Sequence, residues 1–443
     1  MALPTSSQPN PQDFYRRFFQ LASVNILSNL MVPLAGLVDV AFLGHLAEIR
    51  HLAGVALATV LFNYIYWTFG FLRMGTTGTT AQAVGRSDSD TVLLALLRNG
   101  LIALGIGLSI LLLQQPLREL GFTLLSAAPE VKSAGRSYYN ALIWGAPATL
   151  LNFVLIGWFL GREQGGKVLL LSVIGNGANV VLDYLFIVRW GWEGAGAGIA
   201  TAVSQYLMLL AGMLLIYQER WLNSVKAIAN QILDREALKA AFVLNADILI
   251  RTFALVSTFA FFTNLSSALG TIVLATNTLL LQAVTLSAYF IDGLAFATES
   301  FAGMFRGRGT SEKLVLLVRV SGGTSLILGL VFAIAFNLFP DALFRLLTNH
   351  FEVIDPISRY VGWLLPVLGF GSIAYMLDGY FLGLTEGRIL RWSTLIAALV
   401  GFAPVALVAW QLKSSHVLWL ALSLFMLARA VTLGAQVPRT LNH

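Results

Sequence analysis

Residues 30–44 read Leu-Met-Val-Pro-Leu-Ala-Gly-Leu-Val-Asp-Val-Ala-Phe-Leu-Gly, and they continue an apolar run that begins near Phe18. The run is long enough to cross a membrane, yet it contains one carboxylate, Asp39. An ionised side chain at membrane depth costs about 2.5 kcal/mol or more, so it usually faces a bundle interior, pairs, or serves an ion pathway. Asp39 is therefore a functional candidate. The alternative is that Asp39 lies near enough to the helix end at Gly44 to sit among lipid headgroups.

The composition of the whole chain agrees with a membrane protein. Hydrophobic residues make up 57% of the 443 residues and charged residues only 11%, whereas about 25% charged is usual in soluble proteins. Cysteine is absent and the five histidines are scattered, which leaves no thiol chemistry and no recognisable metal-ligand spacing. The basic residues lie in short loops rather than in one patch, so positive-inside topology explains the net charge of +6 better than nucleic-acid binding does.

The apolar segments predict an all-α polytopic protein, because about 20 apolar residues make one span. We count twelve predicted spans, at residues 14–44, 52–74, 91–114, 134–160, 168–190, 195–217, 237–264, 270–298, 314–338, 356–384, 389–411 and 416–436. An even number of spans places both termini on one side. The tails and the loops after even-numbered spans hold about twice as many Lys and Arg residues as the other loops, which predicts cytoplasmic termini in a plasma (inner) membrane protein.

The two halves of the chain resemble each other. Gly157-Trp-Phe-Leu-Gly161 recurs as Gly379-Tyr-Phe-Leu-Gly383, and Trp144-Gly-Ala-Pro147 recurs as Trp363-Leu-Leu-Pro366. A polar connection separates the halves. The predicted organisation is a short disordered cytoplasmic tail at 1–13, a six-helix lobe at 14–217, a cytoplasmic linker at 218–236, a second six-helix lobe at 237–436 and a tail at 437–443. Two parallel six-span repeats are typical of secondary transporters.

No chemistry for converting energy or for catalysis is visible in the sequence. It has no Gly-x-x-x-x-Gly-Lys-Ser/Thr phosphate loop and no long polar segment for a nucleotide-binding domain. The string Gly194-Ala-Gly-Ala-Gly198 opens an apolar span, where close helix packing explains it. We therefore predict that the protein is not an enzyme, has no cofactor, and uses an ion gradient for any uphill transport.

Several of these segments together resemble the multidrug and toxic compound extrusion (MATE) transporters. They are Asp39 within Leu37–His45, Ala-Gln-Ala-Val-Gly-Arg at 81–86, the Gly-x-Phe-Leu-Gly repeats, Asn179-Val-Val-Leu-Asp183 and Gly194–Thr201. Ile291-Asp-Gly-Leu-Ala-Phe-Ala-Thr-Glu299 looks most like the DinF-like branch. The resemblance covers nearly all of residues 14–436. It implies two pseudo-symmetric six-helix lobes in a V and export of bulky organic, often cationic, compounds in exchange for protons or sodium ions.

The first candidate site combines Asp39 with residues of the fifth and sixth spans. Asn179 and Asp183 are four residues apart and share one face of a helix. Two carboxylates in a dry site repel each other, and such a pair can take up and release a proton near neutral pH. The resemblance implies that Asp39, Asn179, Asp183 and Thr201 form a proton or cation site, that Asn152 adds a further polar position, and that the first four would be metal ligands if sodium is the coupling ion. The alternative is a hydrogen-bonded cluster that only holds helices together.

A second group of polar residues lies in the second half. Asp247 and Arg251 are spaced to neutralise each other on one helix. Asp292 and Glu299 are two turns apart on one face and, with Arg251 and Tyr289, are candidates for a substrate site or a second proton site. Asp378 is interpreted as a structural cap near a span end.

Four prolines, Pro33, Pro147, Pro366 and Pro404, fall inside predicted spans, where each removes a helix hydrogen bond. We interpret Pro33 as a hinge. A proline common earlier in this helix in the family, near Val24, is missing. A mechanism that bends the helix at that earlier point is therefore doubtful here.

The sequence thus predicts a monomeric, proton-coupled exporter of small organic molecules in the lipid bilayer. Sodium coupling through the same residues is the close alternative. A lipid-linked oligosaccharide flippase is the alternative from another class, and it would need several arginines for pyrophosphate.

Overall fold

The chain is described here by a computed structural model, which covers residues 11–44, 46, 48–125, 127–219, 221–345 and 351–441. These residues form helices, turns and loops, with no strand among them. Twelve helical segments within this described part are long and apolar enough to span a membrane, which confirms the predicted number of spans. The predicted tail at 1–13 lies mostly outside the described residues, and the predicted tail at 437–443 includes a short helix, α20 (Val437–Leu441).

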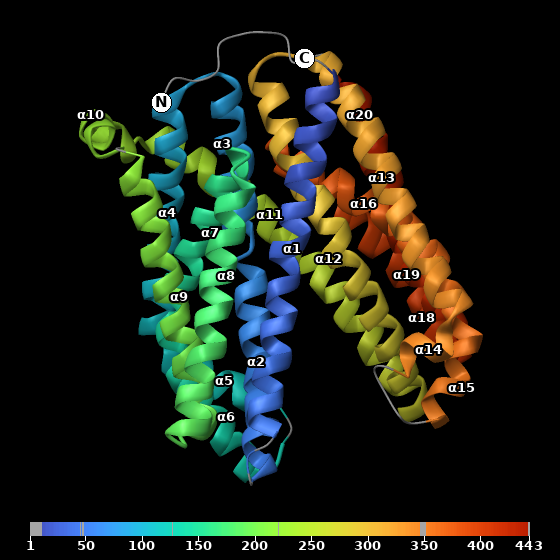
Figure 1. Cartoon of the computed structure of the whole chain (residues 1–443). Helices are drawn as coiled ribbons and strands as arrows, with labels where there is room; N and C mark the ends of the chain where they lie inside the picture. The colour runs from blue at the N-terminus through green and yellow to red at the C-terminus, as the bar shows by residue number, and fades with distance from the viewer. Residues whose placement is uncertain are drawn as a thin grey trace. The chain divides into compact units, whose positions relative to one another are not determined.

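The first half of the chain supplies six of these spans (Figure 1). Its helices are α1 (Pro11–Gly44), α2 (Ile49–Thr68), α3 (Phe71–Gly85), α4 (Ser89–Leu112), α5 (Gln114–Leu124), α6 (Pro129–Leu142), α7 (Ala146–Gly161), α8 (Gly165–Asp183) and α9 (Glu193–Gln218). The second span is made of α2 and α3, and the fourth of α6 and α7.

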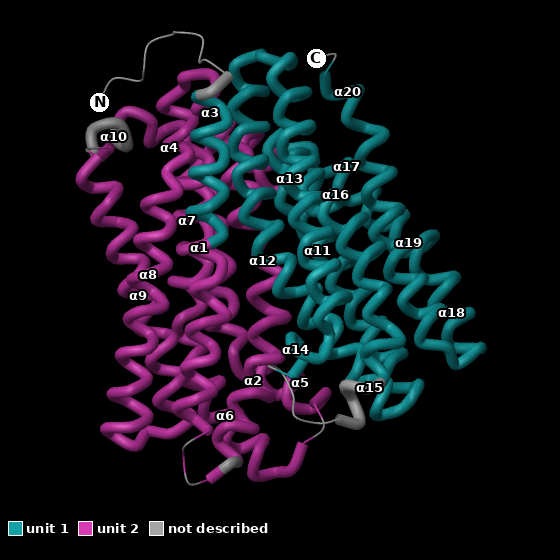
Figure 2. The backbone as a smooth tube through the Cα atoms, turned by 45° about the vertical axis from the view of Figure 1, so that its right-hand side comes forward, with its two compact units in different colours: residues 1–26, 243–443 teal, residues 27–242 magenta. Residues whose placement is uncertain are grey.

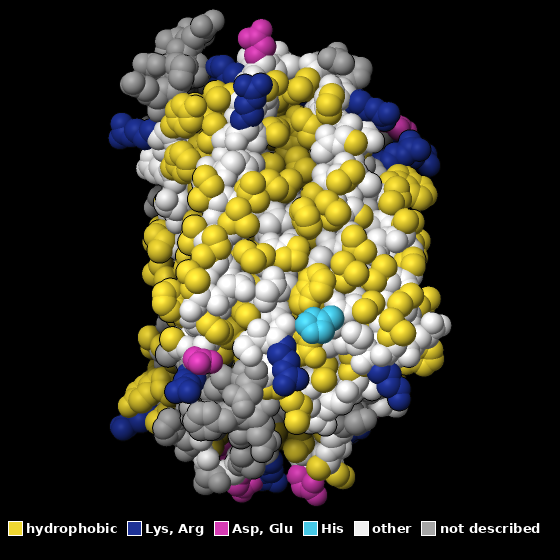
Figure 3. Space-filling model, turned by 90° about the vertical axis from the view of Figure 1, so that its right-hand side faces the viewer, with side chains coloured by type: hydrophobic (Ala, Val, Ile, Leu, Met, Phe, Trp, Pro, Cys, Tyr) yellow, Lys and Arg dark blue, Asp and Glu magenta, His cyan; other side chains and the backbone are white. Residues whose placement is uncertain are grey.

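The second half supplies the other six (Figure 1). After the connecting helix α10 (Leu222–Ile232) come α11 (Arg235–Ala268), α12 (Thr271–Gly307), α13 (Ser311–Leu338), α14 (Pro340–Phe344), α15 (Phe351–Tyr360), α16 (Leu364–Gly383), α17 (Gly387–Ile396), α18 (Ala403–Leu412) and α19 (Ser415–Gly434). Hydrophobic side chains cover the middle of the face shown in Figure 3, and most charged side chains lie near its two ends, as expected for a surface in contact with lipid.

The residues form two compact units (Figure 2). Unit 1 comprises Met1–Ile26 and Val243–His443, and unit 2 comprises Leu27–Phe242. The division therefore falls within α1. Its early turns pack with unit 1, and its later turns, which carry Asp39, pack with unit 2.

Two glycines of α7 allow this helix to pack directly against the backbone of α3 in unit 2. A Cβ atom placed on Gly157 would lie 2.4 Å from the carbonyl oxygen of Arg73, and one on Gly161 would lie 2.6 Å from that of Thr77. Real side chains do not approach a backbone oxygen this closely, so only glycine allows this packing distance. Small residues serve the same purpose where membrane helices meet closely.

The same contact occurs in unit 1 between α16 and α12. A Cβ atom on Gly379 would lie 2.3 Å from the Ala295 carbonyl oxygen, and one on Gly383 would lie 2.2 Å from that of Glu299. Each glycine and each partner is 222 positions after its counterpart in unit 2. The repeated Gly-x-Phe-Leu-Gly sequence is thus a repeated structural contact.

The repeated Trp-x-x-Pro segments mark helix breaks in both units. A 3-10 turn at Ile143–Gly145 precedes Pro147, and another at Val361–Trp363 precedes Pro366. Pro404 follows a π-helical turn at Ala397–Phe402. Pro33, in contrast, lies inside the continuous helix α1. Three of the four interior prolines therefore accompany a change of helix type, as their missing hydrogen bonds predict.

The connection after α9 is fastened to unit 2 by a cluster of charges and indole rings. Glu219 accepts hydrogen bonds from Lys167, from Arg162 at 2.8 Å and from the Trp221 indole at 2.7 Å. The Arg162 guanidinium lies 4.1 Å from the centre of the Trp158 ring. Further along, Arg98 donates to the Gln231 carbonyl oxygen at 2.7 Å, and Ile228 is buried against α4.

We predict that Gly383→Ala destabilises the protein, because its methyl group would overlap the Glu299 carbonyl oxygen. The expected cost is about 1–3 kcal/mol, the usual range for overpacking. Thermal unfolding in detergent measures it as a lower melting temperature. Gly323→Ala is the matched control, since nothing lies within 4 Å of its added methyl group, and an equal loss in that variant would contradict the packing argument.

We predict that the contribution of Glu219 to stability depends on pH. Partial burial alone would raise the pKa of this carboxyl, but hydrogen bonds from Arg162, Lys167 and Trp221 outweigh it and hold the pKa below its usual value. A depressed pKa gives stability that is present above the unfolded-state pKa and is lost as the pH falls through the folded-state pKa. Glu219→Gln should therefore melt below wild type at pH 7, and the difference should shrink as the pH falls below about 4.5. A difference that stays constant down to pH 3.5 would contradict this.

Candidate functional site

The two carboxylates predicted to pair do come together in unit 2. Asp39 is on α1 and Asp183 is the last residue of α8, and their carboxyl groups lie within hydrogen-bonding reach of each other. Asp183 is fully buried and Asp39 is half-buried. Asp183 also directly precedes a π-helical turn, Tyr184–Arg189. Such turns are frequent at functional sites.

Among the described residues, most oxygens of these two carboxylates have no hydrogen-bond donor. Oδ1 of Asp39 and both carboxylate oxygens of Asp183 are shielded from solvent and receive no hydrogen bond from the described residues. Two facing acceptors in an apolar interior are unfavourable without a positive charge or a proton between them. The arrangement is therefore complete only when a proton or a small cation is added.

Asn179 and Thr201 lie together as the second part of this site. The Asn179 side-chain amide donates to the Thr201 hydroxyl at 3.3 Å, which connects α8 with α9. The Thr201 hydroxyl in turn donates to the Ala197 carbonyl oxygen of its own helix at 3.0 Å. Asn179 is one helical turn before Asp183, so its side-chain oxygen belongs to the same face as the carboxylate pair.

Tyr138 of α6 is a member of the site that the sequence did not single out. Its ring is buried, and its hydroxyl lies beside the hydroxyl groups of Thr59 and Thr201 and within electrostatic reach of both Asp39 and Asp183. The sequence feature that could have identified Tyr138 is its position on the buried face of an amphipathic segment. Nothing in the sequence placed that face opposite α1 and α8.

Asn152 is hydrogen-bonded to Gln205 rather than to the carboxylate pair. Its side-chain amide donates to the Gln205 carbonyl oxygen at 2.9 Å and to the Gln205 side-chain oxygen at 3.0 Å. Among the described residues it makes no hydrogen bond to Asp39 or Asp183. These hydrogen bonds link α7 to α9 at Gln205, which is one turn after Thr201.

Pro33 lies between two points at which α1 is connected to α8. The first is a hydrogen bond of 2.5 Å between the hydroxyl groups of Ser28 and Ser172, and the second is the Asp39–Asp183 pair. Pro33 removes a helix hydrogen bond between them. The two segments of α1 can therefore bend relative to each other at Pro33 more easily than in a helix without this proline.

Unit 1 contains a different charged cluster around Asp378. This carboxylate accepts from the guanidinium groups of Arg251 on α11 and Arg429 on α19. The three side chains are at most 6% exposed. The expectation of a helix cap is therefore wrong, because Asp378 is the buried centre of an ion-pair cluster that joins three helices.

Tyr375 and Asp292 lie close to this cluster. The Arg429 guanidinium lies 5.3 Å from the centre of the Tyr375 ring. Asp292, on α12, is within electrostatic reach of Arg429, Tyr375 and Tyr289. Of the predicted second group, Arg251 thus pairs with Asp378, which the sequence did not link to it, Asp292 lies within electrostatic reach of Arg429, and Tyr289 lies beside Asp292.

Two other acidic residues of unit 1 have distinct surroundings. Asp247 pairs with Arg391 of α17, so the expected neutralisation by Arg251 on its own helix is wrong. Glu299 is fully buried, and its backbone carbonyl oxygen faces Gly383 of α16. Glu299 therefore lies at the α12–α16 contact, two turns beyond Asp292.

Comparison with known proteins gives a consistent result over almost the whole chain. Residues 25–185 and 248–407 match the MatE sequence family. The chain is 34% identical to the DNA damage-inducible protein F of Escherichia coli, over 98% of this chain and 93% of that protein. It is 27% identical to a probable multidrug resistance protein NorM of Synechococcus sp., over 92% and 90% of the two chains.

Solved structures share the fold. One is described as the outward-facing conformation of a multidrug resistance MATE family transporter, with a TM-score of 0.86, 19% identity and 99% of each chain covered. Another, of MATE in the bent conformation, gives a TM-score of 0.86 at 20% identity, over 97% of this chain and 95% of the other. The helical architecture is thus one already seen in membrane transporters.

We predict that Asp378→Asn destabilises the protein by about 3–5 kcal/mol, because it leaves two buried guanidinium groups without their carboxylate. Thermal unfolding in detergent would show this as a large fall in melting temperature, and adding Arg429→Met should restore part of it. Asp247→Asn is the comparison variant, since its partner Arg391 is 26% exposed and water can solvate the guanidinium left without its carboxylate, so the loss should be smaller. Equal effects of Asp378→Asn and Asp247→Asn would contradict the assignment of Asp378 as the centre.

Proposed function

Because this chain belongs to the MatE (multidrug and toxic compound extrusion) family of membrane transporters, we propose that it is a secondary active exporter of organic, often cationic, compounds that takes up protons in exchange. The observation that supports this proposal is the Asp39–Asp183 pair, two facing carboxylates without a donor in the described part of unit 2. Protons are the ligand that such a pair can hold with least change in structure.

The proposed proton cycle has two states. With a proton bound, one carboxyl donates a hydrogen bond to the other, and α1 is held against α8. Without it, the two carboxylates repel at a distance where the low dielectric of the interior makes repulsion strong. The segment of α1 after Pro33 can relieve this repulsion by moving, since the Ser28–Ser172 bond holds the earlier segment in place.

Tyr138, Asn179 and Thr201 have supporting roles in this proposal. The Tyr138 hydroxyl is a polar group within electrostatic reach of both carboxylates, and the Asn179–Thr201 hydrogen bond links α8 to α9 beside the pair. Occupancy of the site by a proton then biases which conformation of the transporter is populated. Substrate release on one side and proton release on the other complete the exchange.

Sodium coupling uses the same residues and differs in one requirement. Na⁺ would need several oxygen ligands at once, drawn from Asp39, Asp183, Asn179 and Thr201. The Thr201 hydroxyl already accepts from the Asn179 amide nitrogen and donates to Ala197, which leaves its oxygen one lone pair for an ion, whereas a proton needs only the two carboxylates. We therefore favour the proton. A pyrophosphate-binding flippase is disfavoured because Arg251 and Arg429 are engaged with Asp378.

The proposal includes the setting of the transporter. We place it as a monomer in the plasma (inner) membrane with both termini in the cytoplasm, because Lys and Arg are concentrated in the loops on that side. Its partners would be small organic molecules and lipid, and it would use no cofactor besides the coupling ion.

We predict that Asp39→Asn and Asp183→Asn each reduce proton-driven export at least tenfold, because one carboxylate alone cannot alternate between a shared proton and repulsion. The assay follows ethidium in proteoliposomes under an imposed pH gradient, and separately under an imposed sodium gradient at equal pH. Asp90→Asn, an exposed carboxylate on α4, is the control and should transport as wild type does.

Three outcomes would overturn parts of this proposal. Undiminished transport in both Asp39→Asn and Asp183→Asn would remove the pair from the mechanism. Transport driven only by the sodium gradient would make the same cluster a sodium site. Absence of ethidium transport by wild type under either gradient would reject export of this class of cation.

A further inference from the structure

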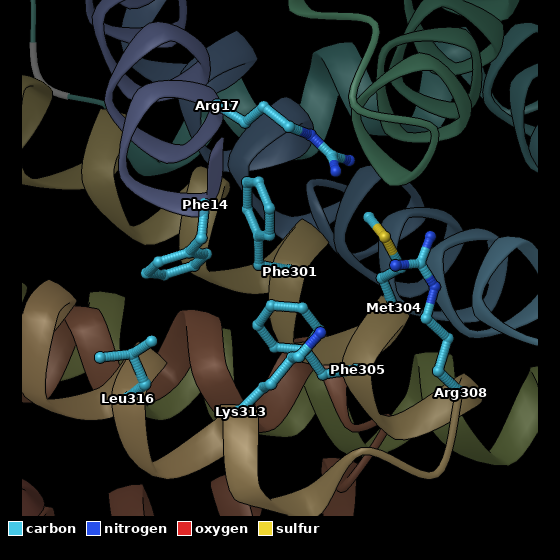
Figure 4. Close-up of a pocket in the computed structure, with 8 residues that line it drawn as sticks. All are labelled: Phe14, Arg17, Phe301, Met304, Phe305, Arg308, Lys313 and Leu316. Carbon is cyan, nitrogen blue, oxygen red and sulfur yellow. The ribbon is translucent and has the colours of Figure 1, made fainter. Parts of the chain in front are cut away.

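A pocket in unit 1 lies where the first turns of α1 meet the end of α12 and the start of α13 (Figure 4). Three basic residues line it, one from each of the three segments: Arg17, Arg308 and Lys313. Figure 4 shows these side chains around a group of aromatic rings. The pocket belongs to neither the carboxylate pair nor the Asp378 cluster.

The floor of the pocket is apolar and closely packed. Phe14, Phe301 and Phe305 have ring centres 5.5–5.9 Å apart, and Met304 completes the buried surface. The Arg17 guanidinium lies 5.6 Å from the centre of the Phe301 ring, and the Lys313 ammonium lies 6.0 Å from that of Phe305. The positive charges are thus placed at the rim of a rigid aromatic surface.

The charged side chains that line this pocket among the described residues are all basic. The acidic residues nearest to them in sequence, Asp13 and Glu312, are exposed and do not line it. Among the described residues, Arg308 and Lys313 form no ion pair. Three cations held around one pocket repel each other, and an anion between them would remove that repulsion.

We propose that this pocket binds the headgroup of an anionic phospholipid. The phosphate would lie among Arg17, Arg308 and Lys313, and the beginning of the acyl chains would contact the phenylalanine rings and Leu316, one turn further along α13. A free phosphate ion could use the cations but not the apolar floor. Basic pockets between membrane helices on the cytoplasmic side bind such headgroups.

The location at the ends of three spans agrees with this occupant. Arg17, Arg308 and Lys313 lie at or near the ends of the spans Asp13–Gly44, Thr271–Gly307 and Ser311–Leu338, where headgroups meet the protein. The assignment to the cytoplasmic leaflet rests on the topology proposed above. That leaflet carries the anionic lipids.

The test measures lipid binding directly, without transport, so its failure is distinguishable from failure of the proposed exporter. The full-length protein in neutral detergent is titrated with phosphatidylglycerol, with phosphatidylcholine, or with inorganic phosphate, and bound molecules are counted by native mass spectrometry. Wild type should bind phosphatidylglycerol at least tenfold more tightly than phosphatidylcholine. The doubly substituted Arg308→Gln/Lys313→Gln should lose about fivefold in affinity for each cation removed, or about 25-fold in total.

The control removes two exposed cations that do not line the pocket, Arg86→Gln/Arg388→Gln. It should bind phosphatidylglycerol as wild type does, and all variants should keep the wild-type circular dichroism spectrum. Equal losses in the two double variants, or no loss in Arg308→Gln/Lys313→Gln, would overturn the site. Binding of inorganic phosphate as tight as that of the lipid would overturn the lipid as its occupant in favour of a free anion.

Discussion

The contact between glycine and a backbone carbonyl is the constraint on which both halves of this structure depend. In each unit, two glycines one turn apart allow one helix to lie against the backbone of another, with no side chain between them. Neither helix could shift outward without losing the packing of the buried residues around it. Gly383 also faces the carbonyl oxygen of Glu299. The same contact therefore fixes the position of the part of α12 that follows Asp292 relative to α16. Both halves therefore keep the same close approach between two helix backbones.

On this shared scaffold the two units carry opposite electrostatic arrangements. In unit 2 two carboxylates face each other and lack a donor, so the site is left incomplete without a proton or cation. In unit 1 one carboxylate is shared by two arginines, so each buried guanidinium already has a carboxylate partner within the fold. A site that gains a charge by binding suits a step that responds to an ion gradient. A site whose buried cations already have a partner suits a fixed structural element. This difference supports placing ion coupling in unit 2.

The sequence anticipated the members of the first site better than those of the second. Asp39 stood out because a carboxylate within an apolar helix needs a partner, and Asn179 and Asp183 were linked by their spacing on one helix. Tyr138 was not found, since its role depends on which face of α6 meets α1 and α8. In unit 1 the spacing of Asp247 and Arg251 suggested a pair, yet each found a partner on another helix, Arg391 and Asp378. Spacing along one helix identifies only the neighbours on that helix. Because an arginine side chain is long, it can instead pair with a carboxylate on another helix.

The sequence by itself determined the membrane class, the number of spans and the existence of two related halves, because these follow from hydropathy, segment length and repeated motifs that act locally. It also indicated where the fourth and tenth spans break, since each Trp-x-x-Pro segment places a proline without an amide hydrogen inside a span. Only the tertiary structure decided which buried charges meet, because those pairings join helices distant in the sequence, such as α11, α16 and α19. It alone also revealed the cationic pocket, whose three basic side chains come from three separate helix ends. Arg308 and Lys313 flank one short loop, but only the packing of α1 on α12, where Phe14 contacts Phe301 and Phe305, brings Arg17 to them.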